Sequence, residues 1–224
     1  MPKAGLTEII CVIDKSGSMS KTAEDAIGGF NEFLKKQREL KSEARFTLTF
    51  FDTTYEIIHK SVTLDEVVEL SSRNYMPGGM TALFDAIGRT IDEVSKVHSD
   101  LGDECPEKVI MVILTDGNEN SSKEYKKELV VSKINEYRGK NWEFVFLGAN
   151  ESAFSEGGRI GVRSQMTRGF RAKSSGGMRK MYTCMDSAVS SYRATSKVNL
   201  DDNKAKDSSS ESKPDTNSEA TPGS

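Results

Sequence analysis

Two patterns of apolar residues alternate along the first 150 residues of the chain. Continuous apolar runs occupy 8–14, 108–116 and 143–149, of which the first is rich in β-branched residues, and such runs are typical of parallel strands buried on both faces. Between them, 22–38 and 81–98 carry apolar side chains at helical spacing. The pattern therefore predicts strands that are connected by amphipathic helices.

The other segments extend this layout. Residues 44–52 and 55–62 read as two strands separated by only two threonines, which predicts an antiparallel hairpin at a sheet edge. Further helices are expected at about 123–138 and at 178–193. The stretch before the last helix, 151–177, predicts one short helix and is otherwise ambiguous.

The order of elements predicts an α/β fold: a three-layer, Rossmann-like sandwich with a mostly parallel central sheet, one antiparallel edge strand and helices on both faces. The 224 residues, 36% of them hydrophobic, suffice for one such domain with a tail. Beyond about Thr195 the sequence holds no aromatic residue and is dominated by polar residues and proline, which predicts disorder. We therefore expect one domain at 1–194 and a disordered polar tail at 195–224.

Charge and cysteine content limit the classes of partner and the cellular compartment that are expected for this protein. The formal net charge of -3 offers no long-range attraction to nucleic acid or to an anionic membrane. No apolar stretch approaches the roughly 20 residues that cross a bilayer. No export signal is visible, and the wide spacing of Cys11, Cys105 and Cys184 suits reduced thiols. We therefore expect a cytoplasmic protein that binds neither nucleic acid nor membrane.

Oxygen-bearing side chains occur where the predicted strands end. Asp14 ends the first apolar run and is followed by Ser16 and Ser18, Asp116 ends another run, and Thr81 follows a double glycine. Ligands of parallel sheets bind beyond the carboxyl ends of the strands, so these side chains are expected to meet. Two carboxylates and three hydroxyls, without imidazole or thiolate, favour Mg²⁺, with Mn²⁺ or Ca²⁺ as alternatives, over zinc or copper.

Three motifs together carry a resemblance to a known family. The D-x-S-x-S sequence of residues 14–18, followed by GGMTALFDAIG at 78–88 and ILTDG at 113–117, resembles the von Willebrand factor type A domain and its metal-ion-dependent adhesion site. The resemblance covers 7–150 closely and the rest of the predicted domain more loosely. Met80 departs from it, because relatives often have a small or hydroxylated residue there.

The resemblance implies a ligand set and a function. Ser16, Ser18 and Thr81 would coordinate Mg²⁺ directly, Asp14 and Asp116 would act largely through bound water, and a partner's carboxylate would complete the octahedron. The implied function is that of a monomeric protein-binding module, not an enzyme, which captures an Asp or Glu side chain of a partner protein. Intracellular members of the family often serve as adaptors for AAA-type ATPases or in multiprotein assemblies, which implies a partner of that kind.

Two other functions remain open at this point. A Mg²⁺-dependent phosphohydrolase would use a strand-terminal aspartate such as Asp14 as its nucleophile, although it normally has a second acid where this chain has Ser16. His59 and His98 are predicted to lie away from the site, which leaves no obvious general base. The third alternative is an inert structural domain.

The segment after Asp116 imitates part of a calcium-binding loop. Asp116, Asn118 and Asn120 match the first three ligand positions of an EF-hand, but Ser121 and Lys127 replace its glycine and its final glutamate. We therefore expect the polar residues of this loop to form a solvated rim beside Asp116.

Overall fold

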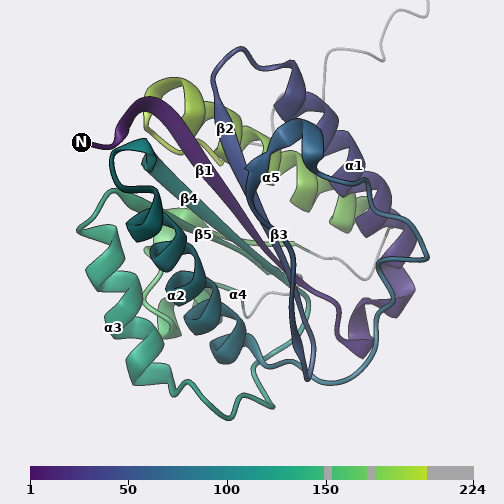
Figure 1. Ribbon diagram of the computed structural model, residues 1–224. Coiled ribbons are helices and arrows are strands. Elements are labelled where there is room, and N and C mark those ends of the chain that lie inside the picture. Colours follow the sequence, from purple (N-terminus) through teal and green to yellow (C-terminus); the bar gives the residue numbers. More distant parts are fainter. Residues whose placement is uncertain (149–152, 171–174, 201–224) are drawn as a thin grey trace, which may run out of the picture.

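A computed structural model describes residues 1–148, 153–170 and 175–200 of the chain (Figure 1). Its centre is a six-stranded sheet in the order β3-β2-β1-β4-β5-β6. All neighbouring strands are parallel except β2 and β3, which pair antiparallel. The strands are β1 (Lys3–Asp14), β2 (Ala44–Phe51), β3 (Tyr55–Thr63), β4 (Pro106–Thr115), β5 (Trp142–Gly148) and β6 (Thr167–Gly169).

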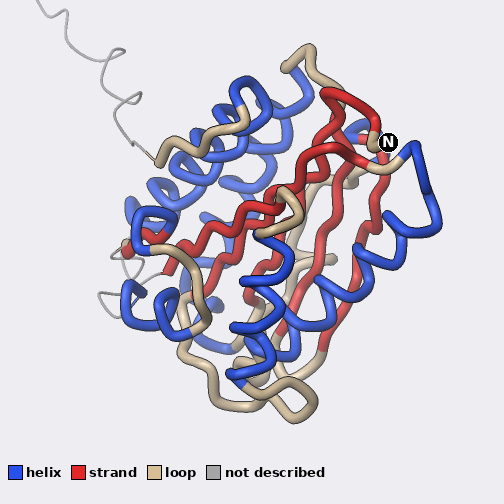
Figure 2. Tube along the Cα trace, turned by 90° about the vertical axis from the view of Figure 1, so that its left-hand side faces the viewer, coloured by secondary structure: helices blue, strands red, loops and turns tan. Residues whose placement is uncertain are grey.

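Helices cover both faces of this sheet, so that the molecule has three layers (Figure 2). One face is covered by α1 and α5, and the other by α2 and α3, with α4 beside β5 and β6. The α-helices are α1 (Ala23–Glu39), α2 (Leu83–Leu101), α3 (Lys127–Arg138), α4 (Ala153–Arg159) and α5 (Ser175–Thr195). The predicted fold class is confirmed.

The central strand β1 shows why its sequence is apolar without alternation. Ile9, Cys11 and Ile13 belong to the core under α1 and α5, whereas Ile10 and Val12 belong to the core under α2 and α3. Successive side chains of a strand point to opposite faces, and here both faces are covered by helices. Both sets of side chains are therefore fully buried.

A glycine sets the distance between α1 and α5. A Cβ atom built on Gly29 would lie 2.4 Å from the ring of Tyr182, which is closer than side-chain atoms approach. The preceding Gly28, on the same helix, has no atom within 4 Å of such a Cβ. The close contact of the two helices thus depends on the missing side chain of Gly29.

The edge strand β3 pairs irregularly with β2. The register shifts twice, on either side of Leu48, and Ser61 has a left-handed backbone conformation with φ of 49°. The Ser61 amide donates to Thr47 Oγ1 at 3.0 Å, which accounts for part of this geometry. As predicted, the hairpin is antiparallel and lies at the edge of the sheet.

The structure departs from the sequence-based expectation after β4. The helix expected from about residue 123 begins at Lys127, because the backbone amides of Lys123, Glu124 and Tyr125 donate to the buried carboxylate of Asp85 and hold a loop there. The ambiguous segment contains β6, which the sequence did not indicate. The last residue of the strand predicted at 143–149 lies outside the described residues.

The packed structure continues past the predicted domain end at 194. Val198 packs against the core, and Leu200 is buried within it. The greater part of the expected tail, residues 201–224, lies outside the described residues. Among the helices that the structure describes, none is long and apolar enough to cross a membrane.

Candidate metal centre

The carboxyl ends of β1 and β4 place two predicted site residues side by side. The strands are parallel neighbours, with Ile13 opposite Leu114. Asp14 therefore meets Thr115, whose hydroxyl donates a hydrogen bond to Asp14 Oδ2 at 2.5 Å. Asp116 is the next residue along the chain.

Asp14 is a fully buried carboxylate with both oxygens engaged. Its Oδ1 atom accepts the amide of Ser16 at 2.7 Å, while Oδ2 accepts the Thr115 hydroxyl. Burial raises the pKa of Asp14 to about 6, against the lowering effect of these hydrogen bonds, and the nearby charge of Asp116 raises it further. The site thus holds two carboxylates close together, and such a pair favours a cation.

The two serines connect the first loop to Asp116. Ser16 and Ser18 share a hydrogen bond between their hydroxyls at 3.0 Å, and the Ser18 hydroxyl donates to Asp116 Oδ1 through a short contact. Ser18 and Asp116 lie 98 residues apart in the sequence. Ser16 is buried whereas Ser18 is exposed, so this cluster of oxygens opens to solvent on one side.

Thr81 is the fifth residue of the predicted set, and its hydroxyl lies close to Gly117. A Cβ atom built on Gly117 would lie 2.7 Å from Thr81 Oγ1 and 3.6 Å from Asp14 Oδ2. The two oxygens therefore flank the same glycine, and a side chain at 117 would displace Thr81. The structure brings all five predicted residues together, namely Asp14, Ser16, Ser18, Thr81 and Asp116.

Backbone hydrogen bonds lock the loop that delivers Thr81 against the loop that carries the serines. The Gly17 amide donates to the Gly79 carbonyl at 3.1 Å, and the Gly78 amide donates to the Lys15 carbonyl at 2.8 Å. Beneath them, the buried Tyr75 hydroxyl donates to the Asp14 carbonyl at 2.6 Å. The relative position of the two loops is thus fixed by the protein itself.

The loop after β4 does more than form a solvated rim. The amide of Thr81 donates to Asn120 Oδ1 at 2.9 Å, and the Asn120 amide donates to the Thr81 carbonyl at 3.0 Å. Glu119 Oε2 accepts the amide of Phe84 at the start of α2. The sequence reasoning missed these roles, because the polar residues after Asp116 reveal no partner until the fold is known.

The two histidines lie away from the five oxygens. His59 Nε2, on the edge strand, accepts the amide of Val68 at 3.1 Å. His98 Nε2 lies 3.5 Å from Oε2 of Glu8, which is six residues before Asp14 on β1. Glu8 is fully buried and also accepts the hydroxyls of Thr47 and Ser61.

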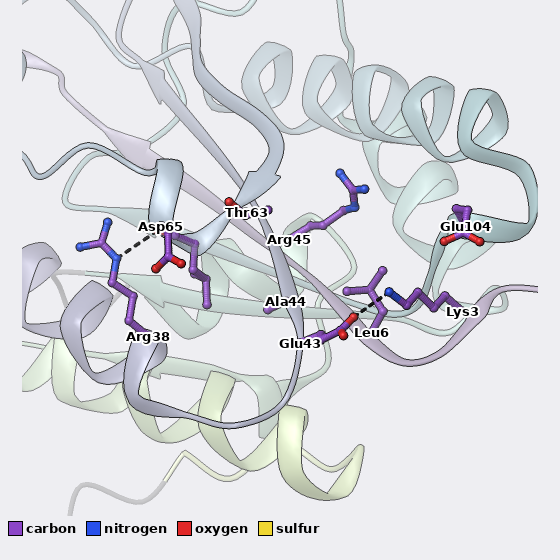
Figure 3. A pocket seen from close by; sticks show the side chains of 10 residues that line it. Lys3, Leu6, Arg38, Glu43, Ala44, Arg45, Thr63, Asp65 and Glu104 are labelled. Carbon is purple, nitrogen blue, oxygen red and sulfur yellow. Dashed lines mark hydrogen bonds and ion pairs between the residues drawn. The ribbon is translucent and has the colours of Figure 1, made fainter.

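A hollow lies at the amino ends of β1 and β2, away from the oxygen cluster (Figure 3). This hollow of about 340 Å³ is lined by charged residues of both signs. Lys3 pairs with Glu43 at 2.7 Å, and Arg38 donates to the carbonyls of Leu64 and Val67. Lys3, Glu43 and Arg38 are thus already engaged by the protein, so the hollow is a weaker candidate than the oxygen cluster.

Within the described residues, no group of three or more His, Cys, Asp or Glu side chains could hold a metal ion. A metal centre rich in such ligands is therefore not found in this part of the chain. The cluster at the carboxyl edge has a different composition, because three of its five donors are neutral hydroxyls. Its chemistry is that of hard oxygen ligands.

No family model and no curated protein matches the sequence. Solved structures do match. Proximal thread matrix protein 1 from the mussel byssus has a TM-score of 0.57 and 18% identity, over 80% of this chain and 44% of that one. The PilB minor pilin of Streptococcus sanguinis, as its D319A mutant, has a TM-score of 0.61 and 13% identity over 84% and 63%.

The chain has the von Willebrand factor type A fold. Another structure of the mussel protein, with a zinc-occupied MIDAS motif, matches this chain with a TM-score of 0.58 and 13% identity, over 81% of this chain and 47% of that one. The chain spans less than two thirds of the length of each of these similar proteins.

Proposed function

We propose that this domain is a metal-dependent protein-binding module, in which Asp14, Ser16, Ser18, Thr81 and Asp116 hold Mg²⁺ and a partner protein supplies an Asp or Glu carboxylate. The observation that supports this most directly is the contact between Ser18 and Asp116, which joins two distant segments into one cluster of oxygens. Turn formation within one loop requires no such contact.

The donor set fits a divalent cation. All five side chains offer oxygen, the donor atom that Mg²⁺, Mn²⁺ and Ca²⁺ prefer. Burial and the nearby charge of Asp116 raise the pKa of Asp14, so the negative charge of this carboxylate is costly in the metal-free site. A bound cation would supply that charge and an open position for an incoming carboxylate.

The neutral and the charged donors of the proposed centre have different roles. Ser16, Ser18 and Thr81 offer lone pairs without negative charge, so the centre keeps its attraction for an anion. The hydrogen bonds from Thr115 and from the Ser16 amide orient the Asp14 carboxylate. The exposure of Ser18 leaves the centre accessible to a partner.

The geometry gives no support to the phosphohydrolase alternative. A nucleophilic aspartate needs an oxygen that can reach the substrate, whereas the Asp14 carboxylate is fully buried and both of its oxygens accept hydrogen bonds. His98 lies beside Glu8, six residues before Asp14 on β1, and His59 accepts a backbone amide on the edge strand. We therefore propose a binding function and no catalytic one.

The identity of the partner and the compartment belong to the same proposal. An AAA-type ATPase or a multiprotein assembly remains the expected partner of a domain that is monomeric on its own. Cys11, Cys105 and Cys184 all lie in the described part of the chain and form no disulfide with one another, which is compatible with a cytoplasmic location.

Calorimetric titration with Mg²⁺ and Mn²⁺ tests the metal centre. Ser16→Ala and Ser18→Ala are expected to weaken binding at least tenfold, because each removes an oxygen donor. Ser20→Ala is the matched control, since the Ser20 hydroxyl donates to the Gly17 carbonyl in the same loop. Equal affinities in all four proteins would contradict the proposed ligand set.

Capture from native lysate with and without chelator tests the binding function. Partners that elute when the metal is removed, and that Asp14→Ala no longer retains, are expected. Partners that remain bound in chelator and ignore this substitution would argue against capture through the metal. Turnover of a generic phosphate ester that the same substitution abolishes would instead favour the hydrolase.

A further inference from the structure

Two methionines stand exposed on the loop that delivers Thr81 to the metal centre. Met76 retains 69% and Met80 retains 53% of its accessible surface, which places both among the most exposed large apolar residues in the described part of the chain. They lie on either side of Pro77, Gly78 and Gly79, and Thr81 is the next residue. The proposed metal centre thus has an apolar border on this loop.

Hydrogen bonds fix the backbone that carries these two side chains. Met76 follows Tyr75, whose buried ring anchors the loop to the Asp14 carbonyl. The Met80 amide donates to Thr53 Oγ1 at 2.8 Å, in the turn between β2 and β3. Both methionines are therefore attached to a backbone that is held against the metal-centre loops at several points.

The physical character of the pair suits a contact surface. When a partner covers apolar side chains, their removal from water stabilises the complex by roughly 25 cal/mol for each Å² of apolar surface buried. Methionine is enriched at protein interfaces and adapts its flexible side chain to the shape of its partner. Lys15, which precedes Ser16, is already paired with Glu56 at 2.8 Å and so adds little attraction for a second acidic side chain.

We propose that Met76 and Met80 select partner segments in which an apolar side chain lies next to the captured Asp or Glu. This proposal rests on the proposed function, because the carboxylate must first bind at the metal centre. The occupant is a partner segment with one acidic residue and apolar neighbours, rather than a run of acidic residues. The metal centre supplies the attraction for the acid, and the methionine pair supplies the preference for its neighbours.

Two synthetic peptides with blocked ends serve as probes: an aspartate flanked by leucines and an aspartate flanked by serines. Binding to the Mg²⁺-loaded protein is followed by NMR of methionine methyl groups labelled with carbon-13. The leucine-flanked peptide is expected to bind roughly fivefold more tightly, as burial of a small apolar area implies. It is also expected to shift the methyl signals of Met76 and Met80.

The double variant Met76→Ser, Met80→Ser is expected to abolish this preference while its affinity for Mn²⁺ stays unchanged. Val68→Ser is the matched control, since Val68 is 60% exposed and lies outside this loop. Equal affinities of the wild-type protein for the two peptides, or an unchanged preference in the double variant, overturn the inference while leaving metal binding intact. Absence of Mn²⁺ binding by the wild-type protein overturns the proposed function itself, so the two failures are distinguishable.

Discussion

The Asn120 side chain and backbone hold Thr81 from both directions. The Thr81 amide donates to Asn120 Oδ1, and the Asn120 amide returns a hydrogen bond to the Thr81 carbonyl, at 2.9 and 3.0 Å. Thr81 Oγ1 lies beside Gly117 as a result of where this backbone is held. A residue that offers no oxygen to the proposed metal thus determines where one of the donors stands.

Replacement of Asn120 tests this positioning role. Asn120→Ala is expected to lower Mg²⁺ affinity by about tenfold, the lower end of what loss of a supporting hydrogen bond costs a metal site. Calorimetric titration measures the effect. Asn118→Ala is the control, because Asn118 is an exposed asparagine of the same loop. If the two variants bind Mg²⁺ equally well, the Asn120 side chain has no positioning role.

The two adjacent glycines of α1 predict opposite effects on stability. Gly29→Ala is expected to lower the free energy of unfolding by about 1–3 kcal/mol, because the new Cβ would collide with the Tyr182 ring. Gly28→Ala is expected to raise it by about 0.5–1 kcal/mol, since this Cβ meets nothing and alanine favours helix. Urea denaturation measures both, and a Gly29→Ala protein as stable as wild type would refute the close contact of α1 and α5.

The buried carboxylate of Glu8 is expected to stabilise the fold through the two hydroxyls whose hydrogen bonds it accepts. Glu8→Ala would leave the hydroxyls of Thr47 and Ser61 without their acceptor and is predicted to cost about 2–4 kcal/mol in unfolding free energy. Glu8→Gln keeps an acceptor oxygen and is predicted to cost less. Denaturant titration of the three proteins checks this order, and a reversed order would show that burying the glutamine N–H₂ group costs more than losing the acceptor.

His59 gives the metal-free protein a component of acid sensitivity. Partial burial holds the pKa of His59 below its ordinary value of 6.5, and its Nε2 atom accepts the Val68 amide only while the ring is neutral. The folded protein binds a proton at His59 less tightly than the unfolded chain does. The free energy of unfolding therefore decreases as pH falls through 6.5 toward the lowered pKa. His59→Gln retains an acceptor without titrating and is expected to lose less stability.

Thermal denaturation of both proteins in chelator, at several pH values between 7 and 5, makes the comparison. Other titrating groups, including Asp14, contribute equally to each protein and cancel in the difference. Parallel pH profiles of His59→Gln and wild type would show that His59 carries no such linkage.

The elements that the sequence predicts are those whose signal is local. The uninterrupted apolar run of β1 and the helical spacing of Phe30, Phe33 and Leu34 on α1 report burial directly. The three-residue β6 is too short to show alternation and lies in a stretch without a clear period. Only its pairing with β5 identifies it as a strand.

The residues of the candidate site likewise fall into those that local sequence reveals and those whose role depends on distant partners. Asp14, Ser16 and Ser18 could be recognised because one loop places them at alternate positions after a buried strand. The partnership of Asn120 with Thr81 spans 39 residues, and nothing local marks it. Asp85 is similar, since its three amide donors lie 38 to 40 residues away and turn an expected first helical turn into a loop.

The irregular edge strand β3 has a consequence for how the molecule meets others. A long, regular edge offers an unpaired row of amides and carbonyls on which a strand of another chain can assemble and start aggregation. Here the backbone twist at Ser61 breaks that row, and Lys60, paired with Glu93, adds charge beside it. Extension of the sheet at this edge by a foreign strand is thereby disfavoured, which leaves the proposed partner the loops at the carboxyl ends of the strands.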